Sequence, residues 1–477
     1  MVKAVTKIYP KSTVREYLKD SSNDLNVVAE SSFRYQLRLP IDEPRGRPKH
    51  IKQLDVEGTL LRLLKQDLTF KGEKTAYATH NIHAFAAKFP PQLPRLFIHE
   101  LTNPGDWVLD PMAGSGTALV EAVIAGRRAI GIDLDPLAVL IARAKSIPLN
   151  LLRCAEVGSE VLQKAKKNFG SATRKKLDIL YPPQAIEFFH YWFEEHTIQE
   201  LYALVRTIAT VKEVDIRAFL QAVFSSTIIT KTGGLTRARD LAHSRPHRDS
   251  HKQVKQCAFE AFSERLRIAI QSQESIVNAT GHAMIERADA RALPLRSNSI
   301  HLIVTSPPYA ANAIDYMRAH KFSLMWLGYV PKMLTTLRSK YIGAELRSPN
   351  NAFASETANR VLQSLQQKDE RRASVVAHYF RDMEVSLHEM HRVMVEGRAA
   401  ILVVGSSTIR GIEIKAPTVL AELADFVGFR VIGVAKREIV RDSRMMPVSH
   451  NSERNGIEAR IHEEGVIGLI KPKTRKS

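Results

Sequence analysis

The sequence predicts an α/β fold, a doubly wound, Rossmann-like domain with helical insertions. Two segments carry this prediction. In residues 108–133, an apolar strand ends at a carboxylate and is followed by a glycine turn, a helix, a second strand and a second carboxylate. In residues 300–305, another apolar strand runs into a polar tip that contains two prolines. Because ligands bind at the carboxyl ends of strands in such folds, we expect both tips to lie at one site.

The first segment has the features of a cofactor-binding turn. Gly114 and Gly116 lack the Cβ atoms that would keep a ligand away from the backbone. The helix that follows them offers free N–H groups at its start to polar ligand atoms. Asp133 ends the second strand about 20 residues beyond the glycines, where such folds hold ribose hydroxyls. The sequence contains no GxxxxGK[ST] motif, so nothing in it supports a P-loop nucleotide triphosphatase.

The second segment ends in residues suited to hold a flat ring that carries an amine: Thr305-Ser306-Pro307-Pro308-Tyr309. A hydroxyl and a backbone carbonyl that accept hydrogen bonds from both amine hydrogens would expose the nitrogen lone pair. The Ser306 hydroxyl and the Pro307 carbonyl are placed to do this, and proline stiffens the turn. The Tyr309 ring can stack on such a flat ring. We therefore predict that Ser306, Pro307, Pro308 and Tyr309 are the catalytic residues.

Together, residues 110–117 and 305–309 resemble the amino-methyltransferases that use S-adenosylmethionine, in particular the DNA cytosine-N4 group. The resemblance implies a seven-stranded methyltransferase domain that transfers a methyl group to the N4 amine of cytosine in double-stranded DNA. Serine in this motif is more typical of cytosine-N4 enzymes, and aspartate of adenine-N6 enzymes. The resemblance implies these cofactor-binding residues: Lys88, Phe89, Asp110, Met112, Ala113, Gly114, Gly116, Thr117, Asp133, Asp289 and Ala290. Residues 80–94 resemble the segment that closes over the cofactor, and Asp289 the acid that faces the adenine amino group.

The order of the two motifs differs from that of most enzymes with this serine motif, in which the target motif comes first. This order leaves the position of the DNA-reading region open. Two alternatives remain: an adenine-N6 or RNA amino-methyltransferase of the same fold, and a non-catalytic DNA-binding specificity subunit. Ser306 argues against the adenine-N6 or RNA amino-methyltransferase, and so does the lack of a recognisable RNA-binding module in the sequence. The intact Asp110, Gly114, Gly116 and Asp133 argue against the second.

We expect four regions in the chain. They are a charged N-terminal segment (1–75), the methyltransferase domain (76–150 and 284–475), a mostly helical insertion that is the candidate target-recognition region (151–283), and a second insertion within the catalytic domain (330–385).

The charge balance favours a nucleic-acid partner. The chain has 69 Lys+Arg against 50 Asp+Glu, a formal net charge of +19, and basic proteins bind polyanions by counterion release. One candidate DNA contact is a basic stretch of the insertion that holds Arg237, Arg239, Arg245 and Arg248, for which a solvated loop is the alternative. The other is residues 44–49, which look like an AT-hook core with Arg45 and Arg47, for which a charged linker is the alternative.

Other site classes find little support. Cys154 and Cys257 do not follow a proline, so methylation of carbon-5 has no evident cysteine nucleophile. Two scattered cysteines also build no zinc cluster or disulfide scaffold, and we expect no metal. No apolar run approaches the ~18 residues that span a bilayer. We therefore expect a cytoplasmic, nucleoid-associated protein. The resemblance to DNA amino-methyltransferases implies a role in a restriction-modification or defence system, with a cognate restriction endonuclease as a further partner.

Overall fold

The computed structural model describes residues 55–170, 174–230, 234–238, 256–310, 315–344, 346, 352–439 and 463–474. Its centre is a seven-stranded sheet. In spatial order the strands are β3 (His282–Arg287), β2 (Arg128–Asp133), β1 (Trp107–Asp110), β4 (Ile300–Thr305), β5 (Met394–Gly405), β9 (Glu463–Ile470) and β8 (Arg430–Glu438).

Six strands of the sheet run one way and β9 runs against them. The strands from β3 to β5 pair in parallel, whereas β9 pairs antiparallel with both β5 and β8. The chain first builds outward from β1 to β2 and β3, and then returns to place β4 on the other side of β1. This is a doubly wound sheet with its switch point between β1 and β4. The predicted Rossmann-like, seven-stranded methyltransferase fold with helical insertions is confirmed.

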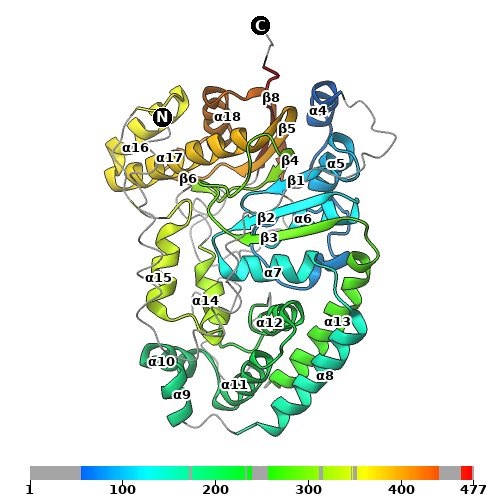
Figure 1. Cartoon of the computed structure of the whole chain (residues 1–477). Helices are drawn as coiled ribbons and strands as arrows, with labels where there is room; N and C mark the ends of the chain where they lie inside the picture. Colours follow the sequence, from blue (N-terminus) through cyan, green and yellow to red (C-terminus); the bar gives the residue numbers. More distant parts are fainter. Residues whose placement is uncertain are drawn as a thin grey trace.

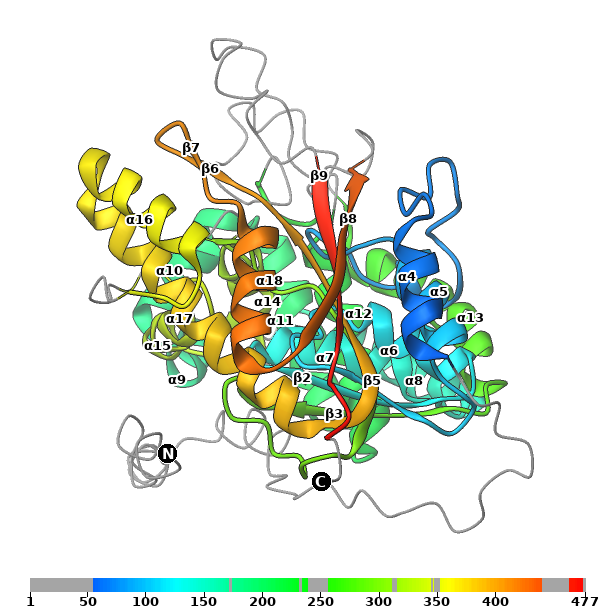
Figure 2. The same ribbon diagram turned by 90° about the horizontal axis from the view of Figure 1, so that it is seen from above.

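Helices cover both faces of the sheet, which explains why its central strands are apolar on both sides. One face packs against α4 (Val56–Leu64), α5 (Gln92–Leu101) and α6 (Thr117–Ile124), and alternating strand residues such as Val108 point to it. The other face packs against α16 (Glu356–Lys368), α17 (Glu370–Val393) and α18 (Ala416–Val427), and Leu109 points to it. Figure 2 shows α4 and α5 on one side of β8 and β9 and the group α16–α18 on the other.

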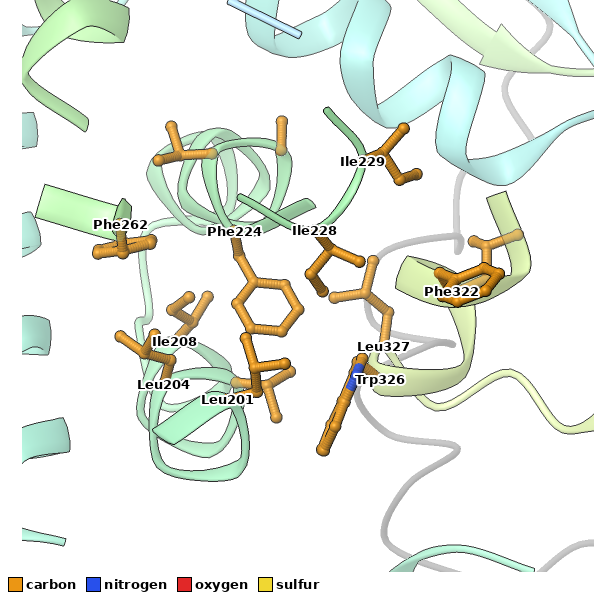
Figure 3. Packing of buried hydrophobic residues seen from close by; sticks show 14 of the residues in the cluster. Leu201, Leu204, Ile208, Phe224, Ile228, Ile229, Phe262, Phe322, Trp326 and Leu327 are labelled. Carbon is orange, nitrogen blue, oxygen red and sulfur yellow. The ribbon is translucent and has the colours of Figure 1, made fainter. Parts of the chain in front are cut away.

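A large helical unit adjoins the β3 edge of the sheet (Figure 1). It contains α8 (Leu151–Lys167), α9 (Arg174–Leu180), α10 (Pro183–Trp192), α11 (Glu195–Ala209), α12 (Val214–Ile228) and α13 (Ala258–Val277), which lie between β2 and β3 in sequence. Two helices that follow β4, α14 (Met317–Trp326) and α15 (Pro331–Lys340), share its core. In Figure 3, Phe224 of α12 lies among Leu201, Leu204 and Ile208 of α11, with Trp326 of α14 beside them. The helical unit therefore packs as one body with the segment that follows the target motif.

The packing of two elements differs from the division of the chain expected from the sequence. Helix α4 lies within the segment 1–75, yet its Leu60 and Leu64 pack so closely on β9 that a Cβ on Gly468 would approach Leu64 to 2.6 Å. The packing of the methyltransferase domain thus reaches back before residue 76. Helix α17 begins within the expected second insertion, 330–385, but it is the last helix of the connection from β4 to β5 and is buried against the sheet. Within the described residues, no helix has the length and apolar character needed to cross a membrane.

The helical unit gives a test of its core. Phe224 of α12 is fully buried, and its replacement by alanine removes an aromatic ring that packs against α11 and α14. We expect this to lower the free energy of unfolding by about 3–5 kcal/mol, the usual cost of such a cavity. Urea unfolding followed by circular dichroism measures it. The control is Phe426→Ala on α18, where the ring is 60% exposed, and an equal loss in both variants would contradict this packing.

Candidate cofactor and target site

A pocket lies where the loops after four parallel strands meet. It is lined by residues at or after the ends of β1 (110–115 and 117), β2 (133–135 and 138), β3 (288 and 290) and β4 (306, 308 and 309). Residues 85 and 87–89 and parts of the segment 315–342 complete the wall. The carboxyl edge of a parallel sheet is where open α/β folds bind ligands. The two motifs that we expected to meet are thus brought together at one pocket.

Most of the predicted site residues line this pocket. They are Lys88, Phe89, Asp110, Met112, Ala113, Gly114, Thr117, Asp133, Ala290, Ser306, Pro308 and Tyr309. Gly116, Pro307 and Asp289 are not among the lining residues.

Each of these three exceptions has its own physical reason. Gly116 precedes α6 with φ of 76°, and a Cβ there would lie 3.0 Å from the Ala142 Cβ, so this glycine permits close packing between α6 and α7 (Pro136–Ser146). Pro307 is buried within its loop. The Asp289 carboxylate accepts hydrogen bonds from the Arg291 guanidinium, with Nη2 to Oδ2 at 2.8 Å. Contact of Asp289 with a cofactor amino group therefore stays a prediction.

Asp110 joins the two motifs. The Thr305 hydroxyl donates a hydrogen bond of 2.7 Å to Asp110 Oδ1, and the Met112 N–H donates to the same oxygen at 3.2 Å. This contact ties the tip of β4 to the tip of β1 and orders the turn that begins the glycine segment. Burial, opposed by these hydrogen bonds, raises the pKa of Asp110 to about 7.

Asp133 shapes the glycine turn from the tip of β2. Its two carboxylate oxygens accept hydrogen bonds of 2.8 Å from the N–H groups of Gly114 and Asp135. Burial and the nearby Asp135 charge raise the pKa of Asp133 to about 6. Asp135 itself caps α7, accepting from the Leu137 N–H at 2.8 Å, and its other oxygen lies 2.6 Å from Nδ1 of buried His320.

Several pocket residues were missed by sequence reasoning. The aromatic wall includes Phe85, Tyr316 and Tyr341, and the Phe85 and Tyr316 ring centroids lie 5.3 Å apart. Phe85 falls inside residues 80–94, which had been singled out as a closing segment, so its neighbourhood carried a signal. Tyr316 and Tyr341 carried none, because they reach the pocket through the packing of α14 and α15 on the helical unit.

Most of the residues predicted to contact DNA lie outside the part of the chain that the structure describes. Arg45, Arg47, Arg239, Arg245 and Arg248 lie outside the described residues. Arg237 is described, and its Nε donates to Glu194 Oε1 at 3.0 Å while Nη1 lies 3.3 Å from the carbonyl oxygens of His190 and Tyr191. In this structure its guanidinium therefore binds the end of α10 and the residues just after it, and a role in DNA binding stays a prediction. In the described part of the chain, no three His, Cys, Asp or Glu side chains are grouped as metal ligands would be.

Comparison with known proteins agrees with this geometry. A family model for N6/N4 enzymes, described as DNA methylase, matches residues 13–144. The type II methyltransferase M.MvaI of Kocuria varians is 25% identical over 384 residues, which cover 75% of this chain and 83% of that protein. This chain is similar to the N4/N6 DNA methylases. M.BsoBI of Geobacillus stearothermophilus is 22% identical to this chain over 447 residues, 80% of this chain and 86% of that protein. M.MjaII of Methanocaldococcus jannaschii is 37% identical over a shorter stretch of 107 residues, 22% of this chain and 20% of that protein.

The methylase uses S-adenosylmethionine as its cofactor, and the pocket fits this molecule. Gly114 has φ of 50°, and a Cβ there would lie 3.2 Å from the Phe85 ring, so only glycine leaves the turn open beside that ring. Asp133 offers carboxylate oxygens suited to ribose hydroxyls. The apolar and aromatic wall suits a flat purine. The pKa of Asp110 is about 7 in the free protein, and a cationic group bound beside it would favour its ionised, negatively charged form.

Asp133 allows a test by cofactor binding. We expect Asp133→Asn to weaken S-adenosylmethionine binding about 10- to 100-fold, because hydrogen bonds to a charged group contribute about 1.5–3 kcal/mol. Ribose hydroxyls that donate hydrogen bonds favour the ionised Asp133 carboxylate. The affinity of the unaltered protein for S-adenosylmethionine should therefore fall as the pH drops below about 6, the pKa of Asp133 in the free protein. Titration calorimetry between pH 5 and 8 measures both effects. An unchanged dissociation constant, or the same loss in the exposed variant Asp425→Asn, would count against a ribose contact.

The glycine that packs α6 on α7 gives a second test. Gly116→Ala and Gly105→Ala both place a side chain at positive φ, at 76° and 84°, which costs about 1–2 kcal/mol. Only Gly116 also brings its Cβ to 3.1 Å from the Ala142 backbone, whereas nothing lies within 4 Å at Gly105. We expect a larger loss of unfolding free energy in Gly116→Ala, measured by urea unfolding. Equal losses would show that close packing of the two helices is not what Gly116 provides.

Proposed function

We propose that this DNA methylase is a site-specific methyltransferase that modifies the exocyclic N4 amine of cytosine. The observation that carries the proposal is the position of Ser306. Its side chain lines the pocket beside the glycine turn, and no other described residue holds its hydroxyl by a hydrogen bond. The neighbouring Thr305 hydroxyl is instead bound to Asp110. Ser306 is therefore free to bind a substrate, whereas Thr305 is part of the frame.

The proposed chemistry depends on positioning. The cytosine amine is a poor nucleophile, because its lone pair is delocalised into the ring. The Ser306 hydroxyl and the Pro307 carbonyl would each accept a hydrogen bond from the amine and draw the nitrogen toward tetrahedral geometry. Tyr309, on the pocket wall, would stack on the extruded base. S-adenosylmethionine, when bound, supplies an electrophilic methyl group, and in-line alignment with the amine lowers the barrier. The product readily loses its proton, to water or through Ser306.

The choice of cytosine over adenine rests on the serine itself. Ser306 stands where adenine-N6 enzymes of the family more typically have aspartate. The relatives with wide coverage are named type II methyltransferases, which supports a role for this chain in a restriction-modification system. A cognate restriction endonuclease is the partner that such a role implies. We further propose that the helical unit, residues 151–283, contains the region that reads DNA sequence, because it adjoins the segment that follows the target motif.

Ser306 should be essential to turnover and dispensable for cofactor binding. We expect Ser306→Ala to lower the rate of methyl transfer about 10²- to 10³-fold, as removal of one aimed hydrogen-bonding group does elsewhere. The dissociation constant of S-adenosylmethionine should stay unchanged. Transfer of labelled methyl groups to unmethylated genomic DNA measures the rate, with exposed Ser297→Ala as control. Full activity of Ser306→Ala would refute the assigned role.

The base is identified by nucleoside analysis. The purified protein is incubated with unmethylated genomic DNA and S-adenosylmethionine, and the digested DNA is examined by mass spectrometry. We expect N4-methylcytosine. N6-methyladenine would keep the site and overturn our interpretation of Ser306. Absence of any methylated base in DNA would refute the proposed substrate.

A further inference from the structure

We propose that Glu464 and Arg437 are positioning residues for the target base, because they hold the hydroxyl end of Tyr309 and so fix its ring in the pocket. The proposal rests on the function proposed above, in which Tyr309 stacks on the base. It assigns a role to two buried charged side chains that stand apart from both sequence motifs.

A continuous chain of hydrogen bonds carries the proposal. The Tyr309 hydroxyl donates to Glu464 Oε1. The other oxygen of this carboxylate, Oε2, accepts from Arg437 Nη1. Arg437 Nε in turn donates to the Leu68 carbonyl at 3.0 Å. Glu464 and Arg437 are only 7% and 5% exposed, so water competes little for these groups.

The reversed strand explains how these residues reach the pocket. A parallel strand brings its last residues to the carboxyl edge of the sheet, whereas antiparallel β9 brings its first. The register pairs Glu464 with Gly405 at the end of β5 and with Arg437 near the end of β8. The loop after β4, which contains Tyr309, leaves the sheet beside β5. A carboxylate near the start of β9 therefore stands where the Tyr309 hydroxyl arrives.

The hydrogen-bonded set of Tyr309, Glu464 and Arg437 is better suited to hold the Tyr309 ring in position than to stabilise the fold. A buried ion pair is weak support for stability, because desolvation offsets the attraction between its charges. Its geometry is specific, however, and a hydrogen bond to a carboxylate is about twice as strong as a neutral one. Burial and the neighbouring Glu464 charge raise the pKa of Tyr309 well above its usual value, so the phenol stays protonated and remains a donor. The ring is thus fixed at its backbone and at its hydroxyl, which leaves its face for a base.

A double-mutant cycle tests the coupling. The variants are Tyr309→Phe, which removes the hydroxyl and keeps the ring, Glu464→Gln, which keeps the shape and removes the charge, and the two combined. We expect each single change to lower kcat/KM for unmethylated genomic DNA about 3- to 10-fold, and the double variant to lose no more than Tyr309→Phe alone, as coupled residues do. The dissociation constant of S-adenosylmethionine, measured by calorimetry, should stay unchanged in all three.

The control is Glu463→Gln, at the adjacent residue, whose ion pair with Lys436 is solvent-exposed. We expect it to leave kcat/KM unchanged. Independent, multiplicative losses from Tyr309→Phe and Glu464→Gln would overturn the proposal, and so would full activity of Glu464→Gln. Failure of the unaltered protein to methylate DNA would instead refute the proposed function, and the inference would fall with it. A weaker affinity for S-adenosylmethionine in Glu464→Gln would assign the residue to the cofactor side and also overturn the proposal.

Discussion

The hydrogen bond between Thr305 and Asp110 is the contact on which the arrangement of the site depends. Strands β1 and β4 are neighbours in space although the helical unit and two other strands separate them in sequence. The loops that leave their tips turn apart, which opens a crevice at every such switch point. Here the bond between the tips sets the separation of the two loops, and with it the distance between a methyl donor held at one and an amine held at the other.

Buried and half-buried polar side chains connect the segment before α5, helix α6 and the end of α7. His80 Nε2 lies 2.6 Å from Glu121 Oε1, which also accepts from the Tyr77 hydroxyl at 2.7 Å, and Lys145 is fully buried below the glycine turn with its pKa lowered well below the usual range by burial. Such groups add little to stability by themselves. Their hydrogen bonds are directional, so they restrict the loops above them to one geometry. A rigid turn would suit the proposed mechanism, in which the methyl donor and the amine must be aligned.

How much of the fold and the site the sequence predicts depends on how far apart in the sequence the interacting residues lie. The strands around Asp110, Asp133 and Ser306, and the glycine turn between the first two, follow from local patterns. Their meeting at one pocket follows from the general topology of parallel sheets. Glu464 and Arg437 were not predictable, because their roles arise from the register of the reversed strand β9 and not from any spacing in the sequence. Asp289 shows a second long-range effect: its carboxylate is bound by Arg291, which also contacts Asp382 of α17, and the sequence around Asp289 does not reveal this contact between distant elements.

The packing of α4 on β8 and β9 has a consequence for the order of the motifs. Residues 56–64 and 463–470, far apart in sequence, share one stretch of core. Consider a circular permutation in which the segment after β9 is joined to the segment before α4, and new chain ends are made within the helices between β2 and β3. Every strand would keep its place in the sheet. The serine motif would then come first in the sequence and the glycine turn second. Methylases with the cofactor motif first and methylases with the target motif first can therefore be circular permutants of one fold, with the same pocket in both.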